Sequence, residues 1–310
     1  MNIRTTVEAD LDTIHALIER QSVNTVTPDR YRDFLADRTY RHDWTWVVEE
    51  DGKILALAIW WGPSEHDHPF AIDGLYYAGD GDPVPVWTAM IEHTLESRPA
   101  DAEPPEYHFF LSSDWKDQPD VVAELGLRRK AAEAAGLTAV TERLRYDWKP
   151  EYGLPPRSTR LRFEPADDEA FVDAFRQVAE GSLDAATRLE VARIGLDASA
   201  RETLKVYKSM QGDRAWWRLA YDADGKLVGF ELPSANQGGP TVGYVGVLPE
   251  HRGHRYSDDL LAEITHFLAE LGAERITADT DFGNVPMARS FERLHYRNFA
   301  VRVVVHFPES

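Results

Sequence analysis

The chain has 310 residues, of which 43% are hydrophobic, and its 34 Lys and Arg against 53 Asp and Glu give a formal net charge of −19. So acidic a composition argues against the broad basic face that binds nucleic acid, and no apolar run reaches the ~20 residues of a membrane span. The absence of cysteine excludes disulfides, thiolate nucleophiles and Cys-ligated metals. Because domains usually have about 100–200 residues, we expect a cytoplasmic protein of two domains, without nucleic-acid or membrane partners.

Two pairs of similar segments indicate a duplicated α/β (α+β) unit. Residues 44–60 and 216–232 each predict a strand, an Asp-Gly turn and a second strand. Residues 132–148 and 291–307 each end a helical run and enter an alternating strand. Three prolines and a glycine interrupt the periodicity at 147–159. We therefore predict domains at 1–150 and 157–310.

The second domain shows a fuller order of elements. A helix is predicted after Asp167, followed by a helical insertion at 183–210, the hairpin at 216–232 and a strand at 242–247. The next helix, at 257–271, carries an apolar stripe at every third or fourth position and ends at Gly272. A strand at 275–278 then leads to Asn284, which can cap a short helix.

A basic turn stands between strand 242–247 and helix 257–271. The first backbone N–H groups of a helix lack intrahelical partners, so such a turn can bind a phosphate group. The candidate residues of this anion site are Arg252, Gly253, His254, Arg255, Tyr256 and Ser257. Ser257 could also cap the helix. The alternative is a basic turn that only balances Glu250, Asp258 and Asp259.

The wider segment resembles the GNAT family of acyl-CoA-dependent N-acetyltransferases. The residues that carry the resemblance lie in "YVGVLPEHRGHRYSDDLLAEITHFLAELGAERI" and "DFGNVPMARSFERLHYRNF". They include the strand ending Val247-Leu248-Pro249, then Arg252 and Ser257, and finally Asn284 and Tyr296. With the duplication, the whole chain resembles tandem GNAT proteins. The resemblance implies two units, each a mixed, mostly antiparallel sheet that is splayed in the middle and flanked by helices.

The resemblance also implies a coenzyme site in the second domain. Acetyl-CoA would place its pyrophosphate on the N–H groups of residues 253–257. Its pantetheine amides would pair with the backbone of Val245 and Val247 and with the Asn284 side chain. The resemblance implies no metal, and a His-Asp-His sequence at 66–68 has no evident third ligand.

Several residues depart from the family pattern. Arg255 stands at a glycine position, His295 replaces the glycine before Tyr296, and Phe291 replaces the usual general-acid tyrosine. A catalytic glutamate is also missing near Thr241. We predict that Arg255 adopts a right-handed conformation, at little strain, and reaches a phosphate oxygen with its side chain.

The sequence therefore offers several candidates for the general base and the general acid. Candidates for the general base are Glu231 and either Asp279 or Asp281, since an amine must lose a proton before it attacks a thioester. Tyr244 and Tyr256 are candidate acids, and Trp216 and Trp217 are either core residues or part of an acceptor groove. Strand 242–247 can also polarise the thioester carbonyl through its backbone N–H groups.

The first domain has no counterpart of the basic turn. Asp80 and Asp82 stand where phosphate would have to bind, so this domain is expected to be degenerate. The predicted function is acetyl-CoA-dependent N-acetylation of a small amine such as an antibiotic, amino acid or amino sugar. The alternatives are a non-catalytic protein that binds coenzyme A or another small molecule, and an acetyltransferase similar to mycothiol synthase. A homodimer is compatible with this sequence, which does not determine the oligomeric state.

Overall fold

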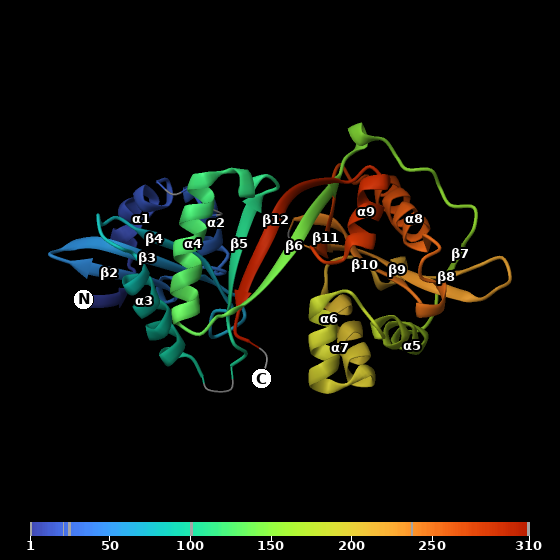
Figure 1. Cartoon of the computed structure of the whole chain (residues 1–310), viewed down its shortest axis with the longest axis horizontal. Coiled ribbons are helices and arrows are strands. Elements are labelled where there is room, and N and C mark those ends of the chain that lie inside the picture. Colours follow the sequence, from blue (N-terminus) through green and yellow to red (C-terminus); the bar gives the residue numbers. More distant parts are fainter. Residues whose placement is uncertain (1, 21, 24–25, 100–101, 237, 309–310) are drawn as a thin grey trace. The chain divides into compact units, whose positions relative to one another are not determined.

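The computed structural model describes residues 2–20, 22–23, 26–99, 102–236 and 238–308 (Figure 1). They form two compact units: an N-terminal unit of Met1–Glu142 with Val301–Ser310, and a C-terminal unit of Arg143–Ala300. These limits differ from the predicted 1–150 and 157–310, because the last strand returns its final residues to the first unit. No helix among the described residues is long and apolar enough to cross a membrane.

The N-terminal unit has helices on a mostly antiparallel sheet. Its strands follow the order β1-β2-β3-β4-β5-β12-β6, and β4 and β5 are parallel. The strands are β1 (Asn2–Thr5), β2 (Thr45–Glu50), β3 (Lys53–Trp61), β4 (Ala71–Tyr77), β5 (Glu106–Ser112) and parts of β6 (Ala139–Trp148) and β12 (Arg297–His306). The α-helices are α1 (Leu11–Ile18), α2 (Pro28–Ala36), α3 (Val84–Ser97) and α4 (Pro119–Ala134), with short 3-10 turns at Glu8–Asp10, His42–Trp44 and Trp115–Asp117.

The C-terminal unit repeats this plan with the strand order β12-β6-β11-β10-β9-β8-β7. Its own strands are β7 (Arg162–Glu164), β8 (Arg218–Tyr221), β9 (Leu227–Asn236), β10 (Gly239–Val247) and β11 (Ile276–Asp281). Its α-helices are α5 (Asp168–Ala179), α6 (Ala185–Ile194), α7 (Leu196–Ser209), α8 (Tyr256–Glu270) and α9 (Val285–Arg293), with 3-10 turns at Pro150–Tyr152, Arg214–Trp216 and Pro249–His251. Strands β10 and β11 are parallel, and the other recorded pairs in this unit are antiparallel.

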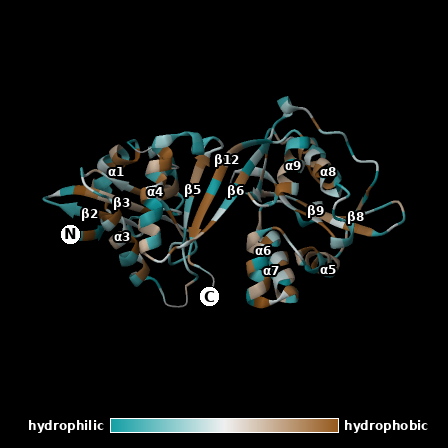
Figure 2. Ribbon diagram, in the orientation of Figure 1, coloured by the Kyte–Doolittle hydropathy of each residue, from teal (hydrophilic) through white to brown (hydrophobic). Residues whose placement is uncertain are grey.

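Two hydrophobic cores cover the two faces of the C-terminal sheet. One lies between the sheet and helices α8 and α9, and includes Leu261, Ile264 and Phe291. The other lies against α5 and α7, and includes Phe175 and Phe230. Figure 2 shows the corresponding hydrophobic stretch along β9. The sheet is thus held from both sides, which fixes the strand ends that line the candidate site.

Most predicted elements of the C-terminal unit are confirmed. The predicted helix at 257–271 is α8, and Gly272 follows it in the left-handed conformation (φ 90°) that commonly ends a helix. The predicted insertion at 183–210 forms α6 and α7. The helix expected after Asp167 is α5, and the Asp167 side chain accepts a hydrogen bond from the Ala170 N–H at 2.9 Å. In the first unit, Asp51 and Gly52 form the predicted hairpin turn, with positive φ at both residues.

Candidate functional site: two adjoining cavities beside a splayed strand

Strand β10 is bent by a bulge and diverges from its parallel neighbour. Its register on β9 shifts between Val242 and Tyr244, at Gly243. A Cβ at Gly243 would lie 2.6 Å from the Leu232 carbonyl oxygen, so only glycine fits there. Among the described residues, β10 and β11 are recorded as paired at Thr241 and Thr277 alone. Beyond this pair the strands leave backbone groups of β10 free to contact a ligand.

Val245 and Val247 direct backbone groups into this opening. The Leu248 N–H donates to the Val228 carbonyl on β9 at 2.9 Å. Because hydrogen-bonded and non-bonded residues alternate in an antiparallel ladder, Val245 and Val247 turn their N–H and C=O groups away from β9. The Val247 carbonyl accepts the Nε–H of Arg252 at 3.2 Å. The remaining groups of both residues fit an added strand, such as an extended chain of amides.

The first cavity lies at the end of β10 and has a volume of about 390 Å³. It is lined by four groups of residues: Tyr244–Val247 of β10, the turn before α8, residues 181–184 after α5, and Asn284 with Pro286 and Met287 at the start of α9. All predicted coenzyme-binding residues except His254 line this cavity. The sequence therefore identified the residues that the fold brings together here.

The turn before α8 presents a row of unpaired backbone donors. Among the described residues, the N–H groups from Gly253 to Ser257 have no hydrogen-bond acceptor, and the first later bond is donated by Asp258 N–H to the Arg255 carbonyl at 3.0 Å. Arg255 is the N-cap residue of α8, but its side chain does not cap the helix. Five free N–H groups at the positive end of a 15-residue helix are suited to bind an anion.

Arg252 supports this turn instead of offering its charge to a ligand. Its guanidinium donates to three carbonyl oxygens at the end of α5 and just after it, those of Val178 at 2.8 Å, Glu180 at 2.8 Å and Gly181 at 3.2 Å. With the bond to Val247, these contacts occupy most of its donors. The prediction of Arg252 as a coenzyme ligand is therefore corrected for its side chain, which ties the turn to the end of α5.

The other residues of the turn have different roles. The ring of His254 turns back on the turn, with Nδ1 3.1 Å from the Arg252 carbonyl. Tyr256 lies under the guanidinium of Arg160, 4.7 Å from its ring centroid. Ser257 does not cap α8, as the sequence had suggested, because its hydroxyl is 2.8 Å from that of Ser290 on α9. Among the described residues, the Arg255 side chain makes no hydrogen bond or ion pair and faces the cavity.

Arg255 does not have the predicted right-handed conformation. Its φ of 61° and ψ of 25° are left-handed, as is His295 with φ 67°. Both residues stand where the resemblance expects glycine, which adopts this conformation without steric strain. The prediction was wrong because the turn must reverse direction at the helix N-cap, and the backbone keeps this geometry with a larger residue.

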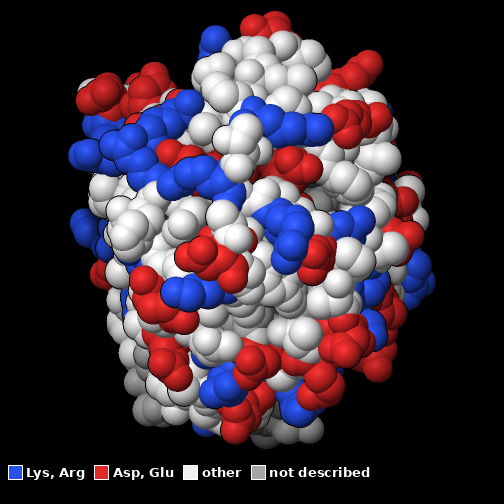
Figure 3. Space-filling view, turned by 90° about the vertical axis from the view of Figure 1, so that its right-hand side faces the viewer, with Lys and Arg blue, Asp and Glu red and all other residues white. Residues whose placement is uncertain are grey.

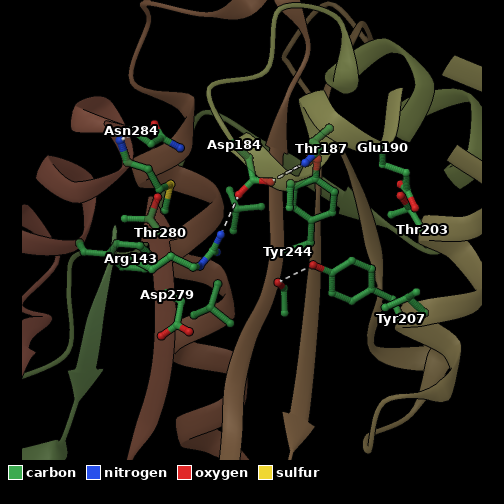
Figure 4. A pocket seen from close by; sticks show the side chains of 17 residues that line it. Arg143, Asp184, Thr187, Glu190, Thr203, Tyr207, Tyr244, Asp279, Thr280 and Asn284 are labelled. Atoms are coloured by element: carbon green, nitrogen blue, oxygen red, sulfur yellow. Dashed lines mark hydrogen bonds and ion pairs between the residues drawn. The ribbon is translucent and has the colours of Figure 1, made fainter. Parts of the chain in front are cut away.

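A second cavity, of about 400 Å³, adjoins the first between β10, β11 and the α6–α7 insertion. Both cavities are lined by Asp184, Tyr244, Val245, Asn284 and Met287. Residues of the second cavity alone are Arg143, Ala186, Thr187, Glu190, Thr203, Val206, Tyr207, Val242, Gly243, Asp279, Thr280 and Phe291. Figure 4 shows Asn284 and Glu190 on opposite sides of this space. A molecule here would meet the coenzyme-like cavity on one side and α6 on the other.

Asn284 connects the two cavities at the start of α9. Its side-chain oxygen accepts a long hydrogen bond from the Met287 N–H at 3.4 Å, which confirms the predicted cap. Its amide nitrogen has no partner among the described residues and can donate to a ligand.

Comparisons with known proteins agree with this geometry. Residues 189–296 match the model of the Acetyltransferase (GNAT) family. The matched residues lie within the C-terminal unit. A search of curated proteins found no match.

Solved structures show the same fold over the whole chain. A GCN5-related N-acetyltransferase from Sphaerobacter thermophilus covers 98% of this chain and 94% of its own, with 18% identity and a TM-score of 0.61. A tandem GNAT protein from the clavulanic acid biosynthesis pathway covers 100% and 99%, with 16% identity and a TM-score of 0.50. A fungal glucosamine N-acetyltransferase region covers 99% of this chain and 38% of that protein, with 13% identity and a TM-score of 0.55. The predicted GNAT resemblance and α/β fold are confirmed.

Within the GNAT domain, Glu231 does not reach either cavity. Its neighbours on β9, Phe230 and Leu232, belong to the core against α5, so Glu231 points to the opposite face, toward Glu263 of α8. It is buried, and its Oε2 atom has no hydrogen-bond partner in the described part of the chain. Burial, with a smaller contribution from Glu263, raises the pKa of Glu231 well above its usual value. The structure therefore corrects the candidate base Glu231, because the sequence does not determine which face of β9 carries it.

The remaining proton-transfer candidates are distributed differently. Tyr244 lines both cavities, and burial raises the pKa of its phenol, which remains protonated at neutral pH. Asp279 lines the second cavity, 3.3 Å from the Nε of Arg145. Asp281 is buried and accepts hydrogen bonds from Arg143 at 2.6 Å and from the Ala185 N–H at 2.5 Å. Its contacts assign Asp281 a structural role.

The aromatic residues divide between core and cavity. Phe291 lines the second cavity and stacks on Tyr146, with ring centroids 4.9 Å apart. Trp216 packs on Phe267, and Trp217 is buried, so neither lines these two cavities. Tyr207, which sequence reasoning missed, donates its hydroxyl to the Gly243 carbonyl in the bulge at 3.1 Å. No motif marked Tyr207, because its role depends on where α7 lies against β10.

The N-terminal unit has no comparable anion site among its described residues. The Asp82 carboxylate accepts the Val84 N–H at the start of α3, at 3.0 Å. The buried Arg128 of α4 donates to the Leu75 carbonyl on β4 at 3.2 Å and lies over the ring of Trp87. In this unit, side chains thus bond to one N–H at the start of α3 and to one carbonyl of β4.

We predict that Glu231→Gln stabilises the protein above about pH 4.5, the ordinary pKa of this carboxyl. The native state keeps Glu231 protonated while the unfolded state ionises, so native stability falls as pH rises from that value toward the raised native pKa. The variant lacks this dependence. Urea unfolding at pH 4 and pH 8 checks it, with a gain expected at pH 8 only. Coenzyme affinity should not change, and a loss of acetyl transfer would restore Glu231 as a base.

We also predict that Arg255→Gly raises the free energy of unfolding by about 0.5–1 kcal/mol. A left-handed residue with a Cβ costs roughly 1–2 kcal/mol, and the greater flexibility of unfolded glycine offsets part of the gain. Arg255→Ala keeps the Cβ and should give no such gain. Chemical unfolding of both variants measures the difference. Equal stability of the two variants would contradict the left-handed assignment.

Proposed function

We propose that this protein is an acetyl-CoA-dependent N-acetyltransferase of a small amine, and that the C-terminal unit binds the coenzyme. The observation that carries the proposal is the row of five unpaired N–H groups at the start of α8, next to the unpaired backbone of β10. These donors fit a pyrophosphate followed by an extended chain of amides. The second cavity then provides room for an acceptor beside the bound thioester.

The residues of the chain have distinct parts in this proposal. The N–H groups of residues 253–257 hold the pyrophosphate, and Val245, Val247 and Asn284 orient the amide chain. Acetyl-CoA, when bound, supplies the activated acetyl group. A β10 N–H near the bulge, which Tyr207 holds in place, can polarise the thioester carbonyl. In this proposal Asp279 accepts a proton from the amine, directly or through water, and Tyr244 donates one to the leaving sulfur; both line the second cavity.

Arg255 adds to coenzyme binding in this proposal. Its side chain is exposed at the first cavity and has no other partner among the described residues, so it can approach the phosphate groups from outside. Because Arg255 is left-handed, Arg255→Gly is expected to stabilise the fold and weaken coenzyme binding at the same time. The two effects have separate causes, the backbone and the guanidinium.

Calorimetry and a thiol assay test the proposal. Coenzyme A should bind at one site per chain, and Arg255→Gly should raise its Kd about tenfold, which corresponds to the loss of ~1.4 kcal/mol. Acetyl-CoA with small amines should release a thiol and form the N-acetyl product. Two equivalent sites would contradict the assignment to the C-terminal unit. Binding without thiol release from any amine would favour the non-catalytic alternative.

A further inference from the structure

The lining of the second cavity contains more negative than positive side chains. It has the carboxylates of Asp184, Glu190 and Asp279, and one guanidinium, that of Arg143. Figure 4 shows Arg143 directed at Asp184. Arg143 contacts Asp184 at 3.2 Å and Asp281 at 2.6 Å, so it is shared by two carboxylates. Although burial alone would lower the pKa of Arg143, these aspartates raise it, and both of them contact its Nη1 atom.

Glu190 differs from the other carboxylates of the cavity. Asp184 pairs with Arg143 and Asp279 with Arg145, but Glu190 has no cationic partner among the described residues. It is half-buried on α6, and its Oε2 accepts the hydroxyl of the buried Ser199 at 2.7 Å. A carboxylate that is held in place at a cavity wall, without a counter-charge, is suited to bind a cation from the ligand.

Glu190 lies at the end of the second cavity that is farther from the coenzyme-like cavity. Tyr244, Val245 and Asn284 are shared with the coenzyme-like cavity, so a reacting amine must lie near them. Glu190 lies on the side opposite Asn284 (Figure 4). Tyr207 also lines the cavity, and its ring stacks on that of Tyr244 with the centroids 5.6 Å apart.

We propose that the acceptor is a small molecule with two amino groups, one of which reacts while Glu190 binds the other as an ammonium. This inference rests on the proposed acetyl transfer. The nitrogen of the reacting amine forms a bond to the acetyl carbon, the carbon–sulfur bond breaks, and the proton lost by the amine goes to the sulfur. The second ammonium is unchanged. The protein's acidity favours the approach of such a dication.

The same arrangement disfavours an amino acid as acceptor. A substrate carboxylate needs a cation whose charge is not already balanced, and the charge of Arg143 is balanced by its ion pairs with Asp184 and Asp281. Placing a further carboxylate beside Asp184, Glu190 and Asp279 would add like-charge repulsion. Of the amine classes considered above, amino sugars and antibiotics with several amino groups fit the cavity, and amino acids do not.

Three probes of similar length test the inference: pentylamine, 1,5-diaminopentane and 5-aminopentanoate. Each is titrated by calorimetry into the protein saturated with coenzyme A, and each is assayed for acetylation with acetyl-CoA. We expect 1,5-diaminopentane to bind at least tenfold more tightly than pentylamine, and 5-aminopentanoate to bind more weakly than either. Increasing salt should reduce the advantage of the diamine, since it depends on charge.

Variants of Glu190 test whether this residue causes the preference for the diamine. Glu190→Gln should lower the affinity for 1,5-diaminopentane about tenfold and leave pentylamine unchanged, and Ser199→Ala should have a smaller effect in the same direction. Glu202→Gln is the matched control, because Glu202 lies on α7, pairs with Lys205 and does not line the cavity.

The outcomes distinguish the two proposals. Coenzyme binding with equal affinity for pentylamine and the diamine would overturn the role of Glu190 and leave acetyl transfer standing. The same holds if Glu190→Gln and Glu202→Gln behave alike. Failure to bind coenzyme A, or preferential diamine binding without thiol release, would instead contradict the proposed function.

Discussion

The left-handed conformation of Arg255 determines how β10 enters α8, and the candidate site depends on that connection. With Arg255 at φ 61°, the backbone reverses at the N-cap and leaves the N–H groups of residues 253–257 without partners among the described residues. Most residues avoid this conformation, so other contacts must hold it. Arg252 supplies them by bonding to the carbonyls at the end of α5 and just after it, and to the carbonyl of Val247. The side chain of Arg252 therefore stabilises the backbone of the turn.

The same unit leaves a second set of polar groups open along β10. Buried backbone groups are nearly always paired, so a strand that loses its neighbour is a place for solvent or a ligand. The Gly243 bulge and the single recorded pair with β11 create this opening, while α5, α7 and α8 hold the strand from both faces. In the N-terminal unit, Arg128 bonds to a carbonyl of β4, and Asp82 accepts an N–H at the start of α3. On the face drawn in Figure 3, acidic and basic side chains are intermixed.

Much of this fold follows from local patterns in the sequence. The apolar stripe of α8, the Asp-Gly turn at Asp51 and Gly52, and the cap at Asn284 each depend on neighbouring residues, and the structure confirms them. The GNAT resemblance also located the first cavity, because its motif is continuous in the chain. Domain limits were less accurate, since β12 carries residues of both units, a long-range pairing that no local signal marks.

The side-chain roles were harder to predict because they depend on tertiary placement. Glu231 is a candidate base by its residue type. Because side chains alternate along β9, however, it faces α8 and not the cavities. The sequence predicts Arg252 as an anion ligand, but its N–H groups donate to carbonyls at the end of α5, which is distant in the chain. Glu190 and Ser199 lie in an insertion without a recognisable motif. Glu190 lines the cavity, and the Ser199 hydroxyl donates to it.

The central claim is that the turn before α8 binds the pyrophosphate of coenzyme A. A crystal structure of the full chain with coenzyme A tests it most directly. The account predicts pyrophosphate oxygens within hydrogen-bonding distance, about 2.7–3.2 Å, of the N–H groups of residues 253–257, with Arg255 still left-handed. It also predicts pantetheine along Val245 and Val247. Coenzyme bound elsewhere, or a turn whose N–H groups remain free of phosphate in the complex, would contradict the account.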